Sequence, residues 1–151
     1  MGTSRYLMEH HVREEIQGKL LYISYSKYEN DWKSLLHSHP FTELFYVQNG
    51  QGSFLIEEEE YPIRQDDFVI VNANVSHTEK SSGSVPLEYV TIGVEGLMFS
   101  FEGEKEHIIF SCKNEQKDLN FYMTTMLKEL TEKNRDFESI CQNLLEVLII
   151  K

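Results

Sequence analysis

The sequence has little of several things, and each shortage excludes a class of protein. It contains two cysteines, Cys112 and Cys141, which are too few for a disulfide framework or a zinc-finger pattern. No run approaches the roughly 18 apolar residues of a membrane span, and no apolar segment typical of a signal peptide is present near residue 1. We therefore expect a cytoplasmic protein without a membrane partner.

Basic residues are also scarce. The chain has 14 of them against 25 acidic residues, and its net charge is −11. Such a charge opposes contact with a polyanion, so this chain alone is not expected to bind DNA or RNA.

The first part of the sequence is rich in β-forming residues. Short segments with aromatic and β-branched side chains alternate with turn signals such as Asn49-Gly50, which is typical of a sandwich or barrel. Pro62 lies inside one of these segments and predicts an edge strand or a bulge there. The predicted strands are 19–28, 43–48, 53–57, 60–64, 67–71, 87–95 and 107–111.

The last part of the sequence has apolar residues at helical spacing. They predict helices at about 115–133 and 136–150. Val147 and Ile150 make the final turn apolar nearly all round, so we expect a second subunit to cover it or the natural chain to continue. A helix packed wholly on its own barrel is the alternative. The residues predicted to take part in dimerisation are Phe137, Cys141, Leu144, Leu145 and Leu148.

Four polar residues form the central motif of the sequence. His37 and His39 are two residues apart, so on a strand they face the same side. Glu43 follows closely, and His77 is expected to arrive from a neighbouring strand. Three imidazoles and a carboxylate could hold a divalent metal ion, and the same groups could hydrogen-bond a polar ligand such as a sugar. Tyr25, Tyr46 and Trp32 could stack on a sugar ring, or they could belong to the core.

The motif from His37 to Gly50 resembles the first cupin motif, although Asp31 stands where that motif begins with Gly. The second cupin motif is present in altered form around His77. Asp66 stands for its turn glycine, which Asp tolerates because it adopts positive φ more easily than most residues. Asn72 stands for its proline, Asn74 for its second glycine, and Lys80-Ser81 for its final Asn region.

Residues 20–150 more broadly resemble the effector-binding half of AraC-type transcription regulators. The matching residues are His37, His39, Glu43, Leu44, Tyr46, Val47, Gly50, Asp67, Phe68 and His77. This resemblance implies a double-stranded β-helix of the cupin or jelly-roll type, followed by two helices that dimerise. It also implies a DNA-binding domain that this chain does not include, and a regulatory N-terminal arm at about 1–18.

These observations predict two regions, a barrel with its arm at 1–112 and a two-helix dimerisation segment at 113–151. The predicted function is to sense a small molecule, for example a sugar, and so to control DNA binding by an attached helix-turn-helix domain. The expected ligand-binding residues are His37, His39, Glu43, His77, Tyr25 and Tyr46. No cofactor is required for this role, and the first four could also be metal ligands. A metal-dependent cupin enzyme, such as a dioxygenase or sugar isomerase, is the alternative.

Overall fold

The computed structural model describes residues 2–7, 18–27, 36–82, 84–99, 105–111 and 117–150, with only the backbone of 117–120 and 148–150. Predictions about Tyr28, Trp32, Cys112 and most of the N-terminal arm therefore lie outside the described residues. The elements in chain order are β1 (Lys19–Lys27), β2 (Thr42–Asn49), β3 (Gln51–Ile56), β4 (Glu59–Arg64), β5 (Asp67–Val71), β6 (His77–Ser81), β7 (Glu88–Glu95), β8 (His107–Ser111), α1 (Lys117–Glu132) and α2 (Phe137–Ile150).

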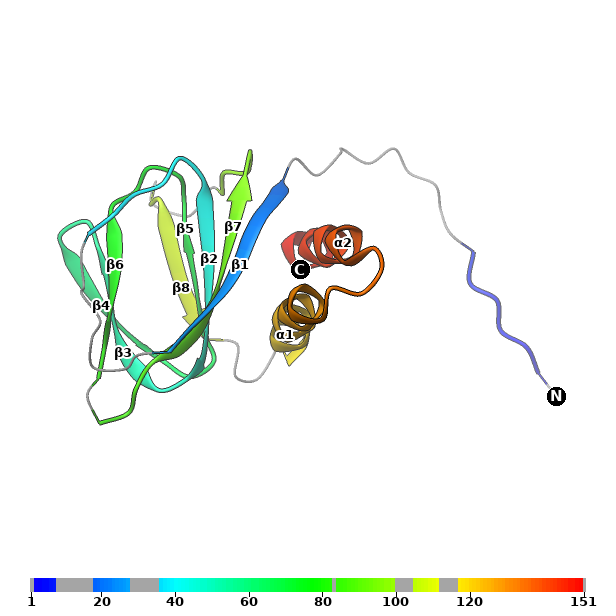
Figure 1. Cartoon of the computed structure of the whole chain (residues 1–151), viewed down its shortest axis with the longest axis horizontal. Coiled ribbons are helices and arrows are strands. Elements are labelled where there is room, and N and C mark those ends of the chain that lie inside the picture. Colours follow the sequence, from blue (N-terminus) through cyan, green and yellow to red (C-terminus); the bar gives the residue numbers. More distant parts are fainter. Residues whose placement is uncertain are drawn as a thin grey trace.

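The described strands form two antiparallel sheets that face each other (Figure 1). The larger sheet has the order β1-β7-β2-β5-β8, and the smaller has the order β4-β3-β6. Pro62 lies in β4, at an edge of the smaller sheet, which confirms the prediction from its missing N–H. The predicted mainly β fold with two following helices is confirmed.

The larger sheet separates two hydrophobic cores, because side chains alternate between its faces. In β2, Leu44 and Tyr46 face α1 and α2, whereas Phe45 and Val47 face the smaller sheet. All five residues of β5 are buried, as expected for an apolar strand covered on both faces. The inner face of the larger sheet is therefore the face that can carry a site between the two sheets.

Turn residues account for much of the local geometry. Asp66 and Asn74 adopt φ angles of 72° and 67°, so both residues that stand for cupin glycines take the left-handed conformation. Gly50 has a φ of 85°, and a Cβ there would lie 1.9 Å from the carbonyl oxygen of Pro86. The β2–β3 turn therefore needs glycine both for its conformation and for this close approach.

Strand β6 confirms that His77 lies on a neighbouring strand, but its range is not among the predicted strands. Its residues HTEKS place His77 and Glu79 inward, so the side that faces the core is polar. The strand pattern requires apolar residues to alternate with polar ones, and this segment has no apolar residues, so its sequence does not predict a strand. The other predicted strands are found with boundary shifts of a residue or two, and 67–71 and 107–111 match.

The helices correct the predicted dimerisation residues. Cys141 and Leu145 are fully buried in the core between α2 and the larger sheet, so neither is accessible to a second subunit. Leu144 is half-buried against the same core, and Phe137 is also half-buried. Leu148 lies outside the described side chains. Among the described side chains of α2, the exposed apolar ones are instead Ile140 and Val147. None of the described helices combines the length and apolar character needed to cross a membrane.

Candidate functional site between the sheets

The four predicted polar residues come together from three segments. His37 and His77 form an isolated antiparallel bridge, with reciprocal backbone hydrogen bonds of 3.0 and 2.9 Å. Glu43 faces the smaller sheet from β2, and His39 lies in the segment that leads into this strand. His37 and His39 thus lie before β2 rather than in a regular strand, and they converge as their spacing predicts.

The side chains of this His–Glu cluster lie within contact distance of one another. Nε2 of His77 is 2.8 Å from Oε1 of Glu43, and Nε2 of His39 is 3.5 Å from the same oxygen. The ring centres of His37 and His77 are 4.5 Å apart. His77 and Glu43 are 2% and 4% exposed, whereas His37 and His39 are half-buried. The cluster thus has a buried base and a partly accessible rim.

Tyr22 is a member of the site that sequence reasoning missed. Its hydroxyl donates a hydrogen bond of 2.5 Å to Oε2 of Glu43. A register shift between Leu20 and Tyr22 turns the Tyr22 ring inward, since Leu20 faces the helices. β-Bulges commonly redirect side chains in this way beside functional sites. Gly93 in β7 leaves room for the ring, because a Cβ there would lie 2.3 Å from Tyr22 Cε1.

The electrostatics of the cluster favour a charged pair at its base. Burial raises the pKa of Glu43, but hydrogen bonds from His77 and Tyr22 outweigh burial and hold that pKa below its usual value. Burial lowers the pKa of His77, but its hydrogen bonds with Glu43 and the Val75 carbonyl outweigh burial and raise that pKa. A protonated His77 donates to Val75 from Nδ1 and to Glu43 from Nε2, which satisfies both nitrogens.

A second buried carboxylate extends the polar wall. Tyr89 donates a hydrogen bond of 2.5 Å to Glu79, whose side chain enters from β6. Burial and the charge of Glu79 raise the pKa of Tyr89; burial and the hydrogen bond to Glu43 raise the pKa of Tyr22, with a smaller contribution from Glu79. Both phenols therefore stay neutral and act as donors. Glu43 from the larger sheet and Glu79 from the smaller sheet thus place two carboxylates in the interior.

The ligand atoms of the cluster, three imidazole nitrogens and a carboxylate oxygen, are of the kind that bind a divalent metal ion. One candidate ligand atom from each of His37, His39, Glu43 and His77 lies within 4.8 Å of the others. The Val75 carbonyl accepts from Nδ1 of His77 and directs Nε2 toward the cluster, as outer hydrogen bonds commonly orient a ligand histidine. Metal binding would have to displace the proton that Glu43 and His77 share, so it would strengthen as pH rises.

Tyr25 and Tyr46 are not brought to the cluster. Tyr46 lies on the helix-facing side of β2, and its hydroxyl donates to Asp66. Tyr25 is 46% exposed and is hydrogen-bonded to the carboxylate of Glu88. Because Tyr25 is three residues after Tyr22 on β1, its side chain faces the other side of the sheet, and it pairs with Val90, which faces the helices. We therefore revise the site: the tyrosines that accompany the cluster are Tyr22 and Tyr89.

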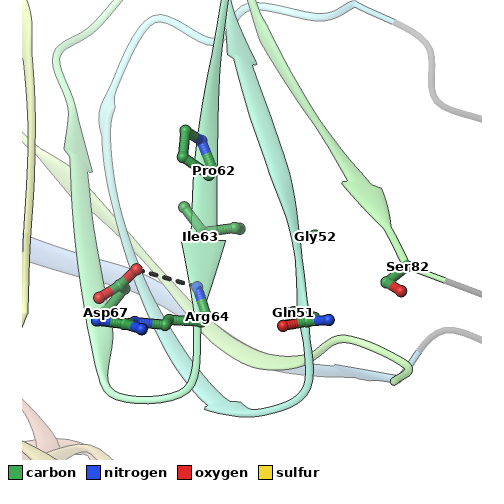
Figure 2. Close-up of a pocket in the computed structure, with 7 residues that line it drawn as sticks. All are labelled: Gln51, Gly52, Pro62, Ile63, Arg64, Asp67 and Ser82. Carbon is green, nitrogen blue, oxygen red and sulfur yellow. Dashed lines mark hydrogen bonds between the residues drawn. The ribbon is translucent and has the colours of Figure 1, made fainter. Parts of the chain in front are cut away.

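A separate pocket of about 540 Å³ lies away from the cluster (Figure 2). Gly52 pairs with Ser81 at this end of β3, whereas Ile56 pairs with His77 at the other end. The backbone N–H of Arg64 donates to the carboxylate of Asp67, which ties the turn below the pocket (Figure 2). The residues that line it are Gln51, Gly52, Pro62, Ile63, Arg64, Asp67 and Ser82. None of the four cluster residues is among them, so this pocket is not the predicted site.

Comparisons with known proteins agree with this geometry. Residues 25–93 match the family model of the cupin domain. The chain is 26% identical over 129 residues to an uncharacterized HTH-type transcriptional regulator, YfiF, of Bacillus subtilis (strain 168). That alignment covers 80% of this chain and 41% of the regulator, so the chain spans less than half of the relative's length.

Solved structures of other proteins also match this chain. A structure of ToxT from Vibrio cholerae, with an unsaturated fatty acid bound, matches with a TM-score of 0.50 and 12% identity. The match covers 91% of this chain and 54% of ToxT. A cupin protein from Bacteroides fragilis matches with a TM-score of 0.45 and 15% identity, over 60% of this chain and 76% of that protein. Residues 25–93 thus match the cupin domain family, and the chain that carries them is similar to a helix-turn-helix-type transcriptional regulator.

Proposed function

We propose that this chain is the ligand-sensing part of a transcription regulator and that a small molecule binds at the His–Glu cluster. The observation that carries the proposal is the convergence of His37, His39, Glu43 and His77 between the sheets, in a chain similar to a helix-turn-helix-type regulator. Ligand binding would shift the population of two arrangements of barrel and helices, and so change DNA binding by an attached domain. Because its target is DNA, the regulator would act in the cytoplasm.

The charge of the interior supports a neutral or cationic ligand. Glu43 and Glu79 are both buried, and no lysine or arginine is buried among the described residues. The protonated His77 balances Glu43, so Glu79 leaves an excess of negative charge that would repel an anionic ligand where charges are poorly screened. The fatty acid in the ToxT structure belongs to that protein; for this chain we propose a polyhydroxylated molecule such as a sugar, which can exchange hydrogen bonds with carboxylates, imidazoles and phenols.

A thermal-shift screen over neutral sugars, sugar acids and divalent metal ions tests the proposal. A ligand at 100 times its dissociation constant stabilises the fold by about 2.7 kcal/mol, which such a screen detects. We expect a response in the wild type that is lost in Glu43→Gln. Tyr46→Phe, which changes the other face of the same strand, should keep the response. An equal response in both variants would place binding elsewhere and contradict the proposal.

A metal-dependent cupin enzyme is the second candidate, because the donor set of the cluster suits a divalent ion. His37, His39, Glu43 and His77 would hold the ion, which would supply Lewis-acid chemistry to a bound substrate. Elemental analysis of purified protein with assays for oxygen consumption and sugar isomerisation separates the two functions. Stoichiometric metal with turnover favours the enzyme, whereas sugar binding without metal favours the sensor.

We further propose that residues 1–112 form the sensing region, with a regulatory arm at about 1–18, and that residues 113–151 form the dimerisation segment. Phe121, Ile140 and Val147 support a homodimer because they are apolar and exposed on α1 and α2. The last two lie seven residues apart on α2, so they share a face. DNA binding would reside in a domain beyond this chain, which agrees with the net charge of −11.

A further inference from the structure

Strand β1 contacts the His–Glu cluster at one point and helix α2 at another. It is an edge strand of the larger sheet and runs beside the helices (Figure 1). Its inward residue Tyr22 donates a hydrogen bond to Glu43, whereas Leu20 and Ile23 pack into the core beneath the helices. One strand therefore has side chains in the site and in the helix layer.

The contact with α2 is made by the side chain of Gln142. Its Nε2 donates a hydrogen bond of 2.7 Å to the carbonyl of Gly18, and its Oε1 accepts one of 2.9 Å from the N–H of Leu20. Both the nitrogen and the oxygen of this side-chain amide are thus hydrogen-bonded to the backbone at the start of β1. Because Gly18 and Leu20 lie on the outer edge of an edge strand, these bonds replace the missing neighbouring strand.

A groove beside this contact shows that β1 and α2 meet here mainly through the side chain of Gln142. A groove of about 640 Å³ lies between β1 and α2, lined by Lys19, Leu20, Leu21 and Tyr22 from the strand and by residues such as Phe137, Cys141 and Gln142 from the helix. Strand and helix are therefore not closely packed along this line. The two hydrogen bonds of Gln142 fix their relative position where side-chain packing leaves space.

Tyr22 is the point at which an occupant of the cluster would act on β1. Oε2 of Glu43 is its acceptor, and Oε1 faces His77 and His39. Any ligand or ion that engages Glu43 competes with Tyr22 or moves its acceptor. The ring cannot adjust freely, because Gly93 and Phe41 lie against it. A change at Glu43 is therefore passed to the strand backbone, two residues from the Gln142 contact.

We propose that β1 links the cluster to helix α2, with Tyr22 and Gln142 as positioning residues. The inference rests on the proposed function in one respect, that the cluster is the ligand site. It adds the route by which occupancy changes the position of α2, the helix that exposes Ile140 and Val147. The link requires two contacts in series, so removal of either one should uncouple the helix from the cluster.

A mutant cycle tests the link without knowledge of the ligand, since Glu43→Gln alters the acceptor of Tyr22 and keeps its shape. Two rates are measured in a Cys112→Ser background. The exchange of the Leu20 amide, followed by NMR, reports on the Gln142 contact. The alkylation of Cys141 by iodoacetamide reports on movement of α2, because that thiol is fully buried beneath the helix.

We expect Glu43→Gln and Tyr22→Phe each to raise both rates about fivefold, which corresponds to one hydrogen bond of about 1 kcal/mol. The double variant should be no faster than either single variant. In Gln142→Ala, Leu20 exchange should rise, and Cys141 alkylation should no longer respond to Glu43→Gln. The matched controls Tyr25→Phe, on the outer face of β1, and Lys128→Ala, exposed on α1, should leave both rates unchanged.

Additive effects in the double variant, near 25-fold, would overturn the link, because independent sites add in free energy. A response to Glu43→Gln that persists in Gln142→Ala would overturn it as well. So would an equal rise in exchange at the core amide of Ile92, since that indicates a general loss of stability. If no ligand is found in the screen but the mutant cycle is non-additive, the proposed function is contradicted and the link stands. If a ligand binds at the cluster but the cycle is additive, the link is contradicted and the proposed function stands.

Discussion

At the scale of single residues, Glu43 determines the chemistry of the interior. A buried carboxylate is costly unless its oxygens are paired. Here Oε1 faces the two histidines His39 and His77, and Oε2 accepts from Tyr22. The residue can therefore remain ionised at the base of the cluster, where it can bind a donor-rich ligand or a metal ion.

The Glu43–His77 pair should make stability depend on pH. The pKa of Glu43 is lowered on folding from 4.5, so its contribution is present above that value and is lost as pH falls through the folded pKa. The pKa of His77 is raised from 6.5, so its contribution is present below that value and is lost as pH rises through the folded pKa. The difference in unfolding free energy between wild type and Glu43→Gln should be largest between pH 4.5 and 6.5.

Urea unfolding across this pH range measures the difference. The exposed variant Glu58→Gln serves as the control and should show no such window. A difference that grows steadily above pH 7 would contradict a charged pair in the metal-free protein.

Gly93 should be sensitive to substitution for a local reason. A Cβ in Gly93→Ala would lie 2.3 Å from Tyr22 Cε1, so the ring must move and its bond to Glu43 must lengthen or break. We expect a loss of about 1–3 kcal/mol in unfolding free energy, typical of overpacking. Gly2→Ala, where the new methyl group meets nothing within 4 Å, should be neutral in the same denaturation experiment.

At the scale of elements, α2 has two apolar faces with different roles. One face buries Cys141 and Leu145 against the larger sheet, and the other exposes Ile140 and Val147. Periodicity in the sequence identifies the apolar positions but does not say which of them the sheet covers. This is why the predicted dimerisation residues include two that belong to the internal core.

The two faces of α2 should respond differently to truncation. Leu145→Ala removes fully buried atoms and should lower the unfolding free energy by about 2–5 kcal/mol. Ile140→Ala, at an exposed position, should change the stability of the monomer by only about 0.5 kcal/mol. Denaturation at low protein concentration separates monomer stability from association. Equal losses in the two variants would mean that the assignment of faces is wrong.

At the scale of the whole molecule, an excess of acidic groups extends from the surface to the interior. The net charge is −11, and Glu43 and Glu79 carry acidic groups into the space between the sheets. We therefore expect a neutral sugar that binds to be favoured at least about tenfold over its sugar acid, a difference of about 1.4 kcal/mol. Isothermal titration of matched pairs measures this preference, and Glu79→Gln should narrow it. Preference for the acid would contradict the proposed ligand class.

Association should depend on the exposed face of α2. The double substitution Ile140→Lys with Val147→Lys places two charges on the apolar stripe and should convert a dimer to a monomer in sedimentation velocity. Glu58→Lys, exposed in the turn between β3 and β4, changes the net charge by the same amount away from α2 and should leave the assembly intact. A dimer that survives the double substitution would place the interface on another surface.

Local patterns in the sequence determined most of the elements. Alternating aromatic and β-branched residues specified the strands, and helical spacing specified α1 and α2, because both periods arise from backbone geometry. The conformational preferences of single residues also sufficed to predict the positive φ of Asp66, which is 72°, and the position of Pro62 in an edge strand. The spacing of His37, His39 and Glu43 together with His77 sufficed to identify the cluster.

Only the tertiary structure decided the rest of the site. A bulge beside Leu20 turns Tyr22 inward, and its place depends on pairing with β7, a strand about 70 residues away in the chain. The same pairing leaves Tyr25 outside, and strand β6 acquires its partner β3 although its inward residues are polar. Register and bulges arise from long-range contacts, which no local period encodes. The sequence alone therefore determined which four residues meet, and the fold decided which tyrosines accompany them.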